Sequence, residues 1–90
     1  MKQLSQTKQF SKDGKRMAKR GKDLEKLRQI VIRLANSETL EPRHRDHALT
    51  GEWKGTRDCH VEPDWMLIYT ATETELRLER TGTHGDLFKK

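Results

Sequence analysis

Four polar side chains in the second half of the chain are of the types that cleave phosphodiesters. They are two imidazoles, a carboxylate and a guanidinium, namely His60, His84, Asp64 and Arg80. Two imidazoles can divide proton acceptance and proton donation near neutral pH. A guanidinium can clamp a phosphate and stabilise the charge that develops on a pentacoordinate phosphorus. This set predicts a metal-independent ribonuclease in which the 2′-OH of the RNA attacks the adjacent phosphorus.

Whether these residues meet depends on three predicted strands. Alternating apolar and polar residues, or a continuous apolar run, predict strands at 56–61, 65–69 and 76–81. Short turns join consecutive strands, so the strands run antiparallel. The end of the first strand, the turn after it and the end of the third strand then lie at the same rim of the sheet. Topology therefore predicts that all four polar residues gather at this rim.

The alternation also assigns side chains to the two faces of the sheet. Cys59 and Val61 share one face, which favours a buried neutral thiol over a nucleophile. Asp58 and His60 share the other face. By the same rule Arg80 falls on the apolar face of its own strand, so the end of that strand must leave the core for Arg80 to reach the rim.

Two helices are predicted before the strands, at 7–20 and 23–36. The buried side of the first helix is predicted to hold Phe10, Gly14, Met17 and Ala18. The corresponding stripe of the second helix is Leu24, Leu27, Val31 and Leu34. Gly14 lowers helix propensity, so we expect it to let another element approach closely. With a short opening strand at Leu4, this order predicts an α+β fold, in which two N-terminal helices pack on a small twisted antiparallel sheet.

The segments between these elements carry further candidates. The connection 37–54 is long for so small a domain, and loops of this length are often functional; it contains His44, His47 and Trp53. Near the C-terminus, glycines at 82 and 85 predict a loosely structured chain. Phe88 follows them and could stack on a base.

Length and composition bound the class of protein. The chain has 90 residues, 31% of them hydrophobic, which predicts a single domain spanning 1–90 with a small core. It lacks an apolar run long enough for a membrane span and the apolar segment of a signal peptide, so we expect a cytoplasmic protein with no membrane partner. The single cysteine excludes a disulfide framework and a cysteine-rich zinc module.

Charge is concentrated at the N-terminal end. Residues 1–33 carry 11 Lys and Arg against 3 Asp and Glu, a net charge of +8, whereas residues 34–90 carry a net charge of −3. Clustered cations suit a phosphate backbone. The candidate RNA-binding residues are Lys8, Lys12, Lys15 and Lys19. A merely solvated helix face is the alternative interpretation.

Each candidate also has a structural explanation that spacing alone leaves open. His60 could be a surface histidine, and Asp64 is a common turn residue. Arg80 could be an exposed charge, His84 the tip of a loop, and Phe88 a cover for the edge of the core. A metal site is disfavoured, because no closely spaced pair of ligands exists, and no cofactor is expected.

Two stretches of the chain resemble a known family. Residues 46–65, DHALTGEWKGTRDCHVEPDW, and residues 79–88, ERTGTHGDLF, are similar in order and spacing to the YafQ-type toxins of the RelE superfamily. The opening FSKD at 10–13 and the helix pair also fit, so the resemblance covers nearly the whole chain. The chain departs from the family pattern at Ala48, where Pro often follows the histidine, and in the tail Lys89-Lys90.

The resemblance implies a RelE-like fold and an endoribonuclease toxin of a type II toxin–antitoxin system that cuts mRNA in the ribosomal A site. The family's functional residues map to His47, His60, Asp64, Arg80, His84 and Phe88. The resemblance implies proton transfer by His84 and Asp64, phosphate stabilisation by Arg80 and mRNA positioning by Phe88. His47 enters on the resemblance alone.

The implied partners are a cognate antitoxin of the ribbon-helix-helix, DinJ-like type, the 70S ribosome with its mRNA, and operator DNA reached only through the antitoxin complex. Two other functions are open. ParE-type relatives on this fold inhibit DNA gyrase without cutting RNA, and the basic N-terminal third would suffice for a passive RNA-binding module. The set of His60, Asp64, Arg80 and His84 discriminates between these functions, because only RNA cleavage requires it.

Overall fold

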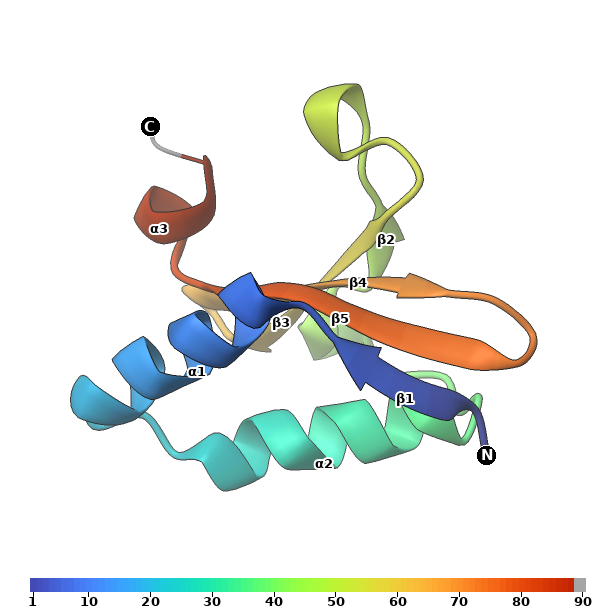
Figure 1. Ribbon diagram of the computed structural model, residues 1–90, viewed down its shortest axis with the longest axis horizontal. Coiled ribbons are helices and arrows are strands. Elements are labelled where there is room, and N and C mark those ends of the chain that lie inside the picture. Colours follow the sequence, from blue (N-terminus) through green and yellow to red (C-terminus); the bar gives the residue numbers. More distant parts are fainter. Residues whose placement is uncertain (89–90) are drawn as a thin grey trace.

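The computed structural model describes residues 1–88, which form a five-stranded sheet with helices on both of its sides (Figure 1). The elements are β1 (Gln3–Gln6), α1 (Lys8–Lys19), α2 (Leu24–Ala35), β2 (His47–Ala48), β3 (Arg57–Glu62), β4 (Trp65–Ala71), β5 (Glu75–Gly82) and α3 (His84–Phe88), with the short 3₁₀ turns η1 (Pro42–His44) and η2 (Gly51–Trp53). The predicted α+β fold is confirmed. None of the helices in the described residues is long and apolar enough to cross a membrane.

The strands lie in the order β1-β5-β4-β3-β2. Strands β2 to β5 pair antiparallel with their neighbours, as the predicted meander requires. The opening strand β1 is present and pairs in parallel with β5, so it adds a parallel edge to an otherwise antiparallel sheet. This pairing brings the start of the chain beside the strand that carries Arg80.

Both predicted helices are confirmed to within one residue at each end. The residue before each helix caps its N-terminus. The Thr7 side chain accepts a hydrogen bond from the backbone N–H of Phe10 at 2.9 Å, and Asp23 accepts one from Glu25 at 3.0 Å. Such caps satisfy backbone donors that a helix leaves unpaired in its first turn. The caps therefore fix where α1 leaves the sheet and where α2 begins.

The buried side of α1 differs from the prediction. Phe10 and Met17 are buried as expected, but the third buried residue is Asp13, and Ala18 is exposed. A Cβ added to Gly14 would meet no atom within 4 Å, so the expected close approach at this glycine is wrong. Hydrophobic periodicity could not find Asp13, because it counts only apolar residues.

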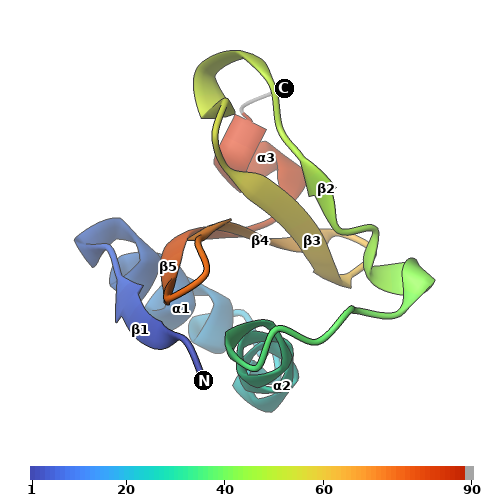
Figure 2. The ribbon, with the colours of Figure 1, turned by 90° about the vertical axis from the view of Figure 1, so that its right-hand side faces the viewer.

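The two faces of the sheet are covered unequally. The larger core lies against α1 and α2 and includes Phe10, Met17, Leu27, Ile30, Trp65, Leu67 and Leu76. On the other face a small cluster consists of Met66, Ile68 and Leu87, with Leu49, Trp53 and Phe88 packed against it. Helix α2 lies on the first side, whereas α3 and the loop around η2 project from the second (Figure 2). This second, sparsely covered side is called the open face below.

A β-bulge overturns the predicted orientation of Arg80. The register between β4 and β5 shifts between Ile68 and Tyr69, so Tyr69 pairs with Leu78 and Ile68 pairs with Arg80, leaving Glu79 as the extra residue. Cross-strand partners share a face. Arg80 therefore lies on the open face with Ile68, and not on the face of Leu76 and Leu78. Simple alternation fails because one inserted residue reverses the parity of everything after it.

Two segments without predicted structure are ordered into short elements. The connection 37–54 contains η1, β2 and η2, and its two-residue strand β2 pairs with β3. The chain expected to be loose near Gly85 instead forms α3, whose Leu87 is buried against Met66 and Ile68. The apolar contact explains why a glycine-containing segment is helical here. The tail Lys89-Lys90 lies outside the described residues.

Candidate active site

Three histidines on the open face share one hydrogen-bonding pattern. Their Nδ1 atoms lie 2.7 Å from Asp64 Oδ1 for His84, 3.1 Å from the Pro63 carbonyl oxygen for His60, and 2.6 Å from the Arg45 carbonyl oxygen for His47. Within residues 1–88 no Nε2 of the three makes a hydrogen bond. A neutral imidazole that donates from Nδ1 accepts at Nε2. Each ring is thus held in the tautomer that can take up a proton at its free nitrogen.

The hairpin between β3 and β4 joins two of these rings. Asp64 accepts hydrogen bonds from both Nδ1 and the backbone N–H of His84, at 2.7 and 3.1 Å, and so fixes the start of α3. The centroids of the His60 and His84 rings are 5.7 Å apart, edge to face. One helical turn later, the Phe88 ring lies 6.3 Å from the His84 ring. The structure therefore brings His60, Asp64, His84 and Phe88 together at one rim of the sheet.

The two rings differ in the charge of their partners. The hydrogen bond from His84 lowers the pKa of Asp64, which stays ionised near neutral pH. An adjacent carboxylate favours the protonated, cationic form of an imidazole. The partner of His60 is a neutral carbonyl, which gives no such charge stabilisation. The two rings therefore differ in the group that holds Nδ1, which is a carboxylate for His84 and a backbone carbonyl for His60.

His47 reaches the open face from β2, where it is the cross-strand partner of Asp58. Its Nε2 lies 3.8 Å from the Asp58 carboxylate. Arg45, whose carbonyl holds the ring, adopts the left-handed conformation with φ of 46° and turns the chain into the strand. Arg80, Ile68, Asp58 and His47 are successive cross-strand partners. The sheet register therefore places His47 and Arg80 in one row across the open face.

Asp58 is a buried carboxylate that the predicted site did not include. The residue is only 3% exposed, and its buried Oδ1 has no hydrogen-bond partner in the described part of the chain. Burial raises its pKa, and the nearby His60, His47 and His84 act in the opposite direction. The available signal was parity, since alternation already placed Asp58 on the same face as His60. A carboxylate without donors beside three imidazoles is a candidate member of the site.

The Arg80 side chain is bound by a residue of helix α1 and not by its cross-strand partners. Its Nε and Nη2 donate to the carboxylate of Asp13 in α1 at 2.8 and 3.1 Å, and this contact raises the pKa of Arg80. Among the described residues, its Nη1 bonds to no other group. The side chain is 23% exposed. Arg80 therefore remains a cation with one free nitrogen at the edge of the site.

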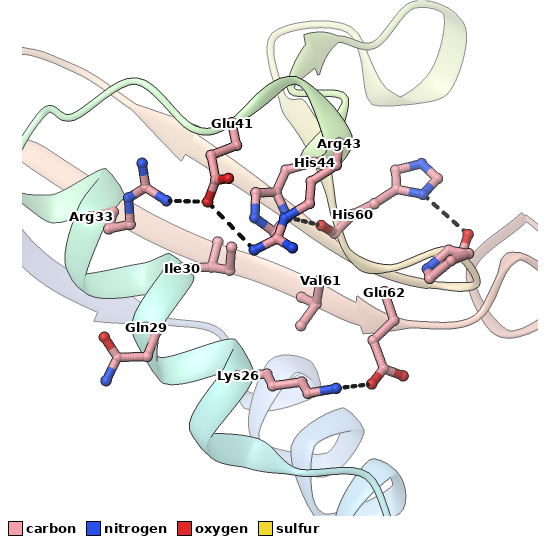
Figure 3. A pocket seen from close by; sticks show the side chains of 11 residues that line it. Lys26, Gln29, Ile30, Arg33, Glu41, Arg43, His44, His60, Val61 and Glu62 are labelled. Carbon is pink, nitrogen blue, oxygen red and sulfur yellow. Dashed lines mark hydrogen bonds and ion pairs between the residues drawn. The ribbon is translucent and has the colours of Figure 1, made fainter.

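A hollow of about 480 Å³ lies on the other side of β3, between α2 and η1 (Figure 3). Lys26 pairs with Glu62 at its rim, and Glu41 pairs with Arg33 and Arg43. His44 lines it and is bound through Nδ1 to the His60 carbonyl at 2.6 Å. The imidazole of His60 points away from this hollow, toward Pro63. The hollow therefore lies behind the strand that carries His60, and the free Nε2 atoms of the candidate site do not line it.

Comparison with known proteins identifies the family. The family model described as "Bacterial toxin of type II toxin-antitoxin system, YafQ" matches residues 2–89. The chain belongs to the YafQ toxin family. It is 53% identical over 81 residues to the mRNA interferase toxin YafQ of Escherichia coli K12, covering 89% of this chain and 88% of that one.

Solved structures of two bacterial toxins are similar to this chain in fold. The toxin in the E. coli DinJ–YafQ toxin–antitoxin complex superposes with a TM-score of 0.89 at 49% identity, covering 97% of both chains. A metal-bound toxin from Helicobacter pylori superposes with a TM-score of 0.91 at 40% identity, covering 98% of this chain and 100% of that one. In this YafQ-family chain, residues 1–88 contain no group of three or more His, Cys, Asp and Glu side chains placed to hold a metal ion.

The remaining predicted residues lie on α1 and in β3. All four lysines, Lys8, Lys12, Lys15 and Lys19, are exposed, and none forms an ion pair with another described residue. Cys59 is buried on the helix-covered face, and burial raises the pKa of its thiol. This agrees with the predicted neutral thiol. The lysines form a row of unneutralised charge on one helix.

Proposed function

We propose that this chain is a ribosome-dependent mRNA interferase, the toxin of a type II toxin–antitoxin pair, and that it cleaves mRNA in the ribosomal A site without a metal. The observation that carries the proposal is the set of imidazoles on the open face, each anchored through Nδ1 and free at Nε2. The name of its E. coli relative, mRNA interferase toxin, supports the same substrate. Acid–base cleavage of RNA requires two such groups around one phosphate.

In the proposed mechanism His60 accepts the 2′-OH proton at its free Nε2. The 2′-oxygen then forms a bond to the adjacent phosphorus, and the bond from phosphorus to the 5′-oxygen breaks. His84, protonated and backed by Asp64, donates its Nε2 proton to the leaving 5′-oxygen. The products are a 2′,3′-cyclic phosphate and a 5′-hydroxyl. His47 would serve as a second base, and the Nδ1 hydrogen bond that its ring shares in kind with that of His60 supports this role.

Charge and stacking complete the proposed site. The free Nη1 of Arg80 would bind the phosphate and stabilise the charge of the pentacoordinate transition state. Phe88, beside His84, would stack on a base of the mRNA. Lys8, Lys12, Lys15 and Lys19 would contact ribosomal RNA, since their charges are not neutralised within the described chain.

The proposed partners follow from the relatives. The DinJ–YafQ complex supports a DinJ-like antitoxin that binds this chain and suppresses its activity. Operator DNA would be bound by the toxin–antitoxin complex and not by the isolated toxin, in the cytoplasm where ribosomes are. A gel shift that detects tight operator binding by the isolated toxin would contradict this part of the proposal.

The test is mRNA cleavage on programmed ribosomes in the presence of EDTA. Wild type should cut in the A site and leave a 5′-hydroxyl on the downstream fragment, whereas His84→Ala should lose about 100-fold or more in rate. Glu25→Gln is the control, because among the described residues the Glu25 side chain forms hydrogen bonds only with Arg28 and Gln29 on α2. Ribosome binding by wild type without cleavage would overturn the proposal in favour of a passive RNA-binding module. Gyrase inhibition without cleavage would favour a ParE-like toxin.

A further inference from the structure

We propose that Asp13 in α1 is a positioning residue that aims the Arg80 guanidinium at the scissile phosphate. This inference rests on the proposed function, because it assigns a role relative to the phosphate that Arg80 would bind. Asp13 is 67 residues away from Arg80 in sequence and is not on any strand. Among the described residues its side chain forms hydrogen bonds with Arg80, Thr81, Gln9 and Arg16, and of these only Arg80 belongs to the proposed site.

Asp13 is saturated with hydrogen bonds. Its side chain is fully buried, and it accepts from Arg80 Nε at 2.8 Å, Arg80 Nη2 at 3.1 Å, the Thr81 backbone N–H at 3.2 Å, Gln9 Nε2 at 3.1 Å and Arg16 Nη2 at 2.8 Å. Two of these donors belong to one guanidinium, so the carboxylate fixes the plane of the Arg80 head group as well as its position. Burial opposes ionisation of Asp13, but the hydrogen bonds from Arg80, Gln9 and Thr81 hold its pKa below the usual value. The pair is therefore a fixed ion pair.

The carboxylate is built into the edge of the sheet. Strand β1 pairs with β5 only as far as Leu78, and beyond that point α1 supplies the partners. The Thr7 hydroxyl donates to the Glu79 carbonyl at 2.7 Å, and Asp13 accepts the next free N–H, that of Thr81. A backbone donor at a strand edge must find a partner when it is buried. Asp13 is thus anchored to the backbone beside Arg80, in the segment where the β-bulge turns Arg80 to the open face.

The geometry leaves the other side of the guanidinium for substrate. Asp13 occupies Nε and Nη2, while Nη1 bonds to no group among residues 1–88. A guanidinium held along one edge loses little further freedom when its remaining donor meets a phosphate. A second ion pair ties the same helix to α3, because Arg20 donates to Asp86 through both terminal nitrogens at 2.6 and 3.0 Å. Helix α1 and its C-cap residue Arg20 are therefore tied by ion pairs to both β5 and α3.

The test compares Asp13→Asn with wild type in two backgrounds, native and Arg80→Ala, by single-turnover mRNA cleavage on programmed ribosomes. In the native background we expect Asp13→Asn to lower the cleavage rate about tenfold, since a small misplacement of a catalytic group costs one to two orders of magnitude. In the Arg80→Ala background we expect no further loss, because the group that Asp13 aims is absent. A purely structural role would lower the rate by the same factor in both backgrounds, and that additive result would overturn the inference.

A second variant separates positioning from stability. Gly14 is helical, and a Cβ there meets nothing, so Gly14→Ala should stabilise α1 without touching the site. Asp13→Asn combined with Gly14→Ala should regain thermal stability and keep the tenfold loss of rate. Recovery of the rate together with stability would contradict positioning. Wild type that fails to cleave would instead overturn the proposed function, and the two failures are distinguishable.

Discussion

Two carboxylates are buried beside opposite edges of the same sheet, and their pKa values are shifted in opposite directions. Asp13, on the β5 side, accepts five hydrogen bonds, and its pKa is lowered despite complete burial. Asp58, on β3, has one buried oxygen that no donor among residues 1–88 reaches, and burial raises its pKa. The difference lies in the donors and not in the depth of burial.

The comparison separates two uses of a buried acid. Asp13 is an ionised anchor that holds the position of another group, because its charge is matched by donors in the folded state. Asp58 has no such set of donors among the described residues; burial raises its pKa, and the imidazoles of His60, His47 and His84 act in the opposite direction. An unpartnered acid of this kind costs stability and is typical of a site where charge moves.

The largest expected effect is on folding. Asp13→Ala would leave Arg80, Arg16 and the Thr81 N–H without their acceptor and should lower the free energy of unfolding by about 3 kcal/mol. Urea denaturation followed by circular dichroism measures this loss. Asp58→Asn is the counterpart, and it should leave stability unchanged or raise it by up to about 1 kcal/mol. Equal losses in the two variants would remove the distinction between the two acids.

Substitution of Asp58 should slow cleavage even though it does not lower stability. Asp58→Asn keeps the shape of the side chain and removes the carboxyl group that lies beside three imidazoles of the proposed site, so we expect about tenfold slower cleavage at neutral pH. The acidic limb of the rate profile should move to lower pH, because a base without the nearby anion loses its proton more easily. A profile that keeps its position in the variant would show that Asp58 does not act on the imidazoles.

The pH dependence of stability also distinguishes the two acids, because their pKa shifts change the free energy of unfolding in opposite directions as the pH rises. The pKa of Asp13 is below its usual value of 3.8 in the folded protein, so its contribution is complete above about pH 4 and is lost as the pH falls further. The pKa of Asp58 is above 3.8, so its destabilising contribution appears as the pH rises from 3.8 through the folded value. Thermal melts from about pH 3 to pH 7 should show less acid sensitivity in Asp13→Asn than in wild type. The rise in melting temperature of Asp58→Asn should be confined to the upper part of that range.

The smallest effect is expected for an exposed acid. Asp64 is 67% exposed, and its hydrogen bond to His84 lies in solvent, so Asp64→Asn should leave the melting temperature within experimental error. The same variant should slow cleavage, because a neutral amide no longer favours protonated His84. A clear loss of stability would show that Asp64, like Asp13, is a structural anchor, in this case of α3.

Much of the site could be predicted, because it follows from local pattern and strand order. The run 65–69 and its hairpin predict that His60, Asp64 and His84 meet, and in the structure they do. The helix α3 could not be predicted, because Gly82 and Gly85 indicate a loop locally. The helix is stabilised instead by a contact of Leu87 with residues some twenty positions earlier. Asp58 was visible on the correct face, but its lack of donors is a property of the packed structure.

The sequence by itself determined the chemical groups, the two helices, the meander and thus the rim where two imidazoles and a carboxylate gather, since these depend on periodicity and short turns. The tertiary structure decided how those groups are tuned. A single inserted residue, Glu79, turned Arg80 to the open face, and a residue 67 positions away, Asp13, fixed its guanidinium. Parity and hydropathy are local quantities, whereas a bulge and a buried ion pair exist only once strand, helix and edge are packed together.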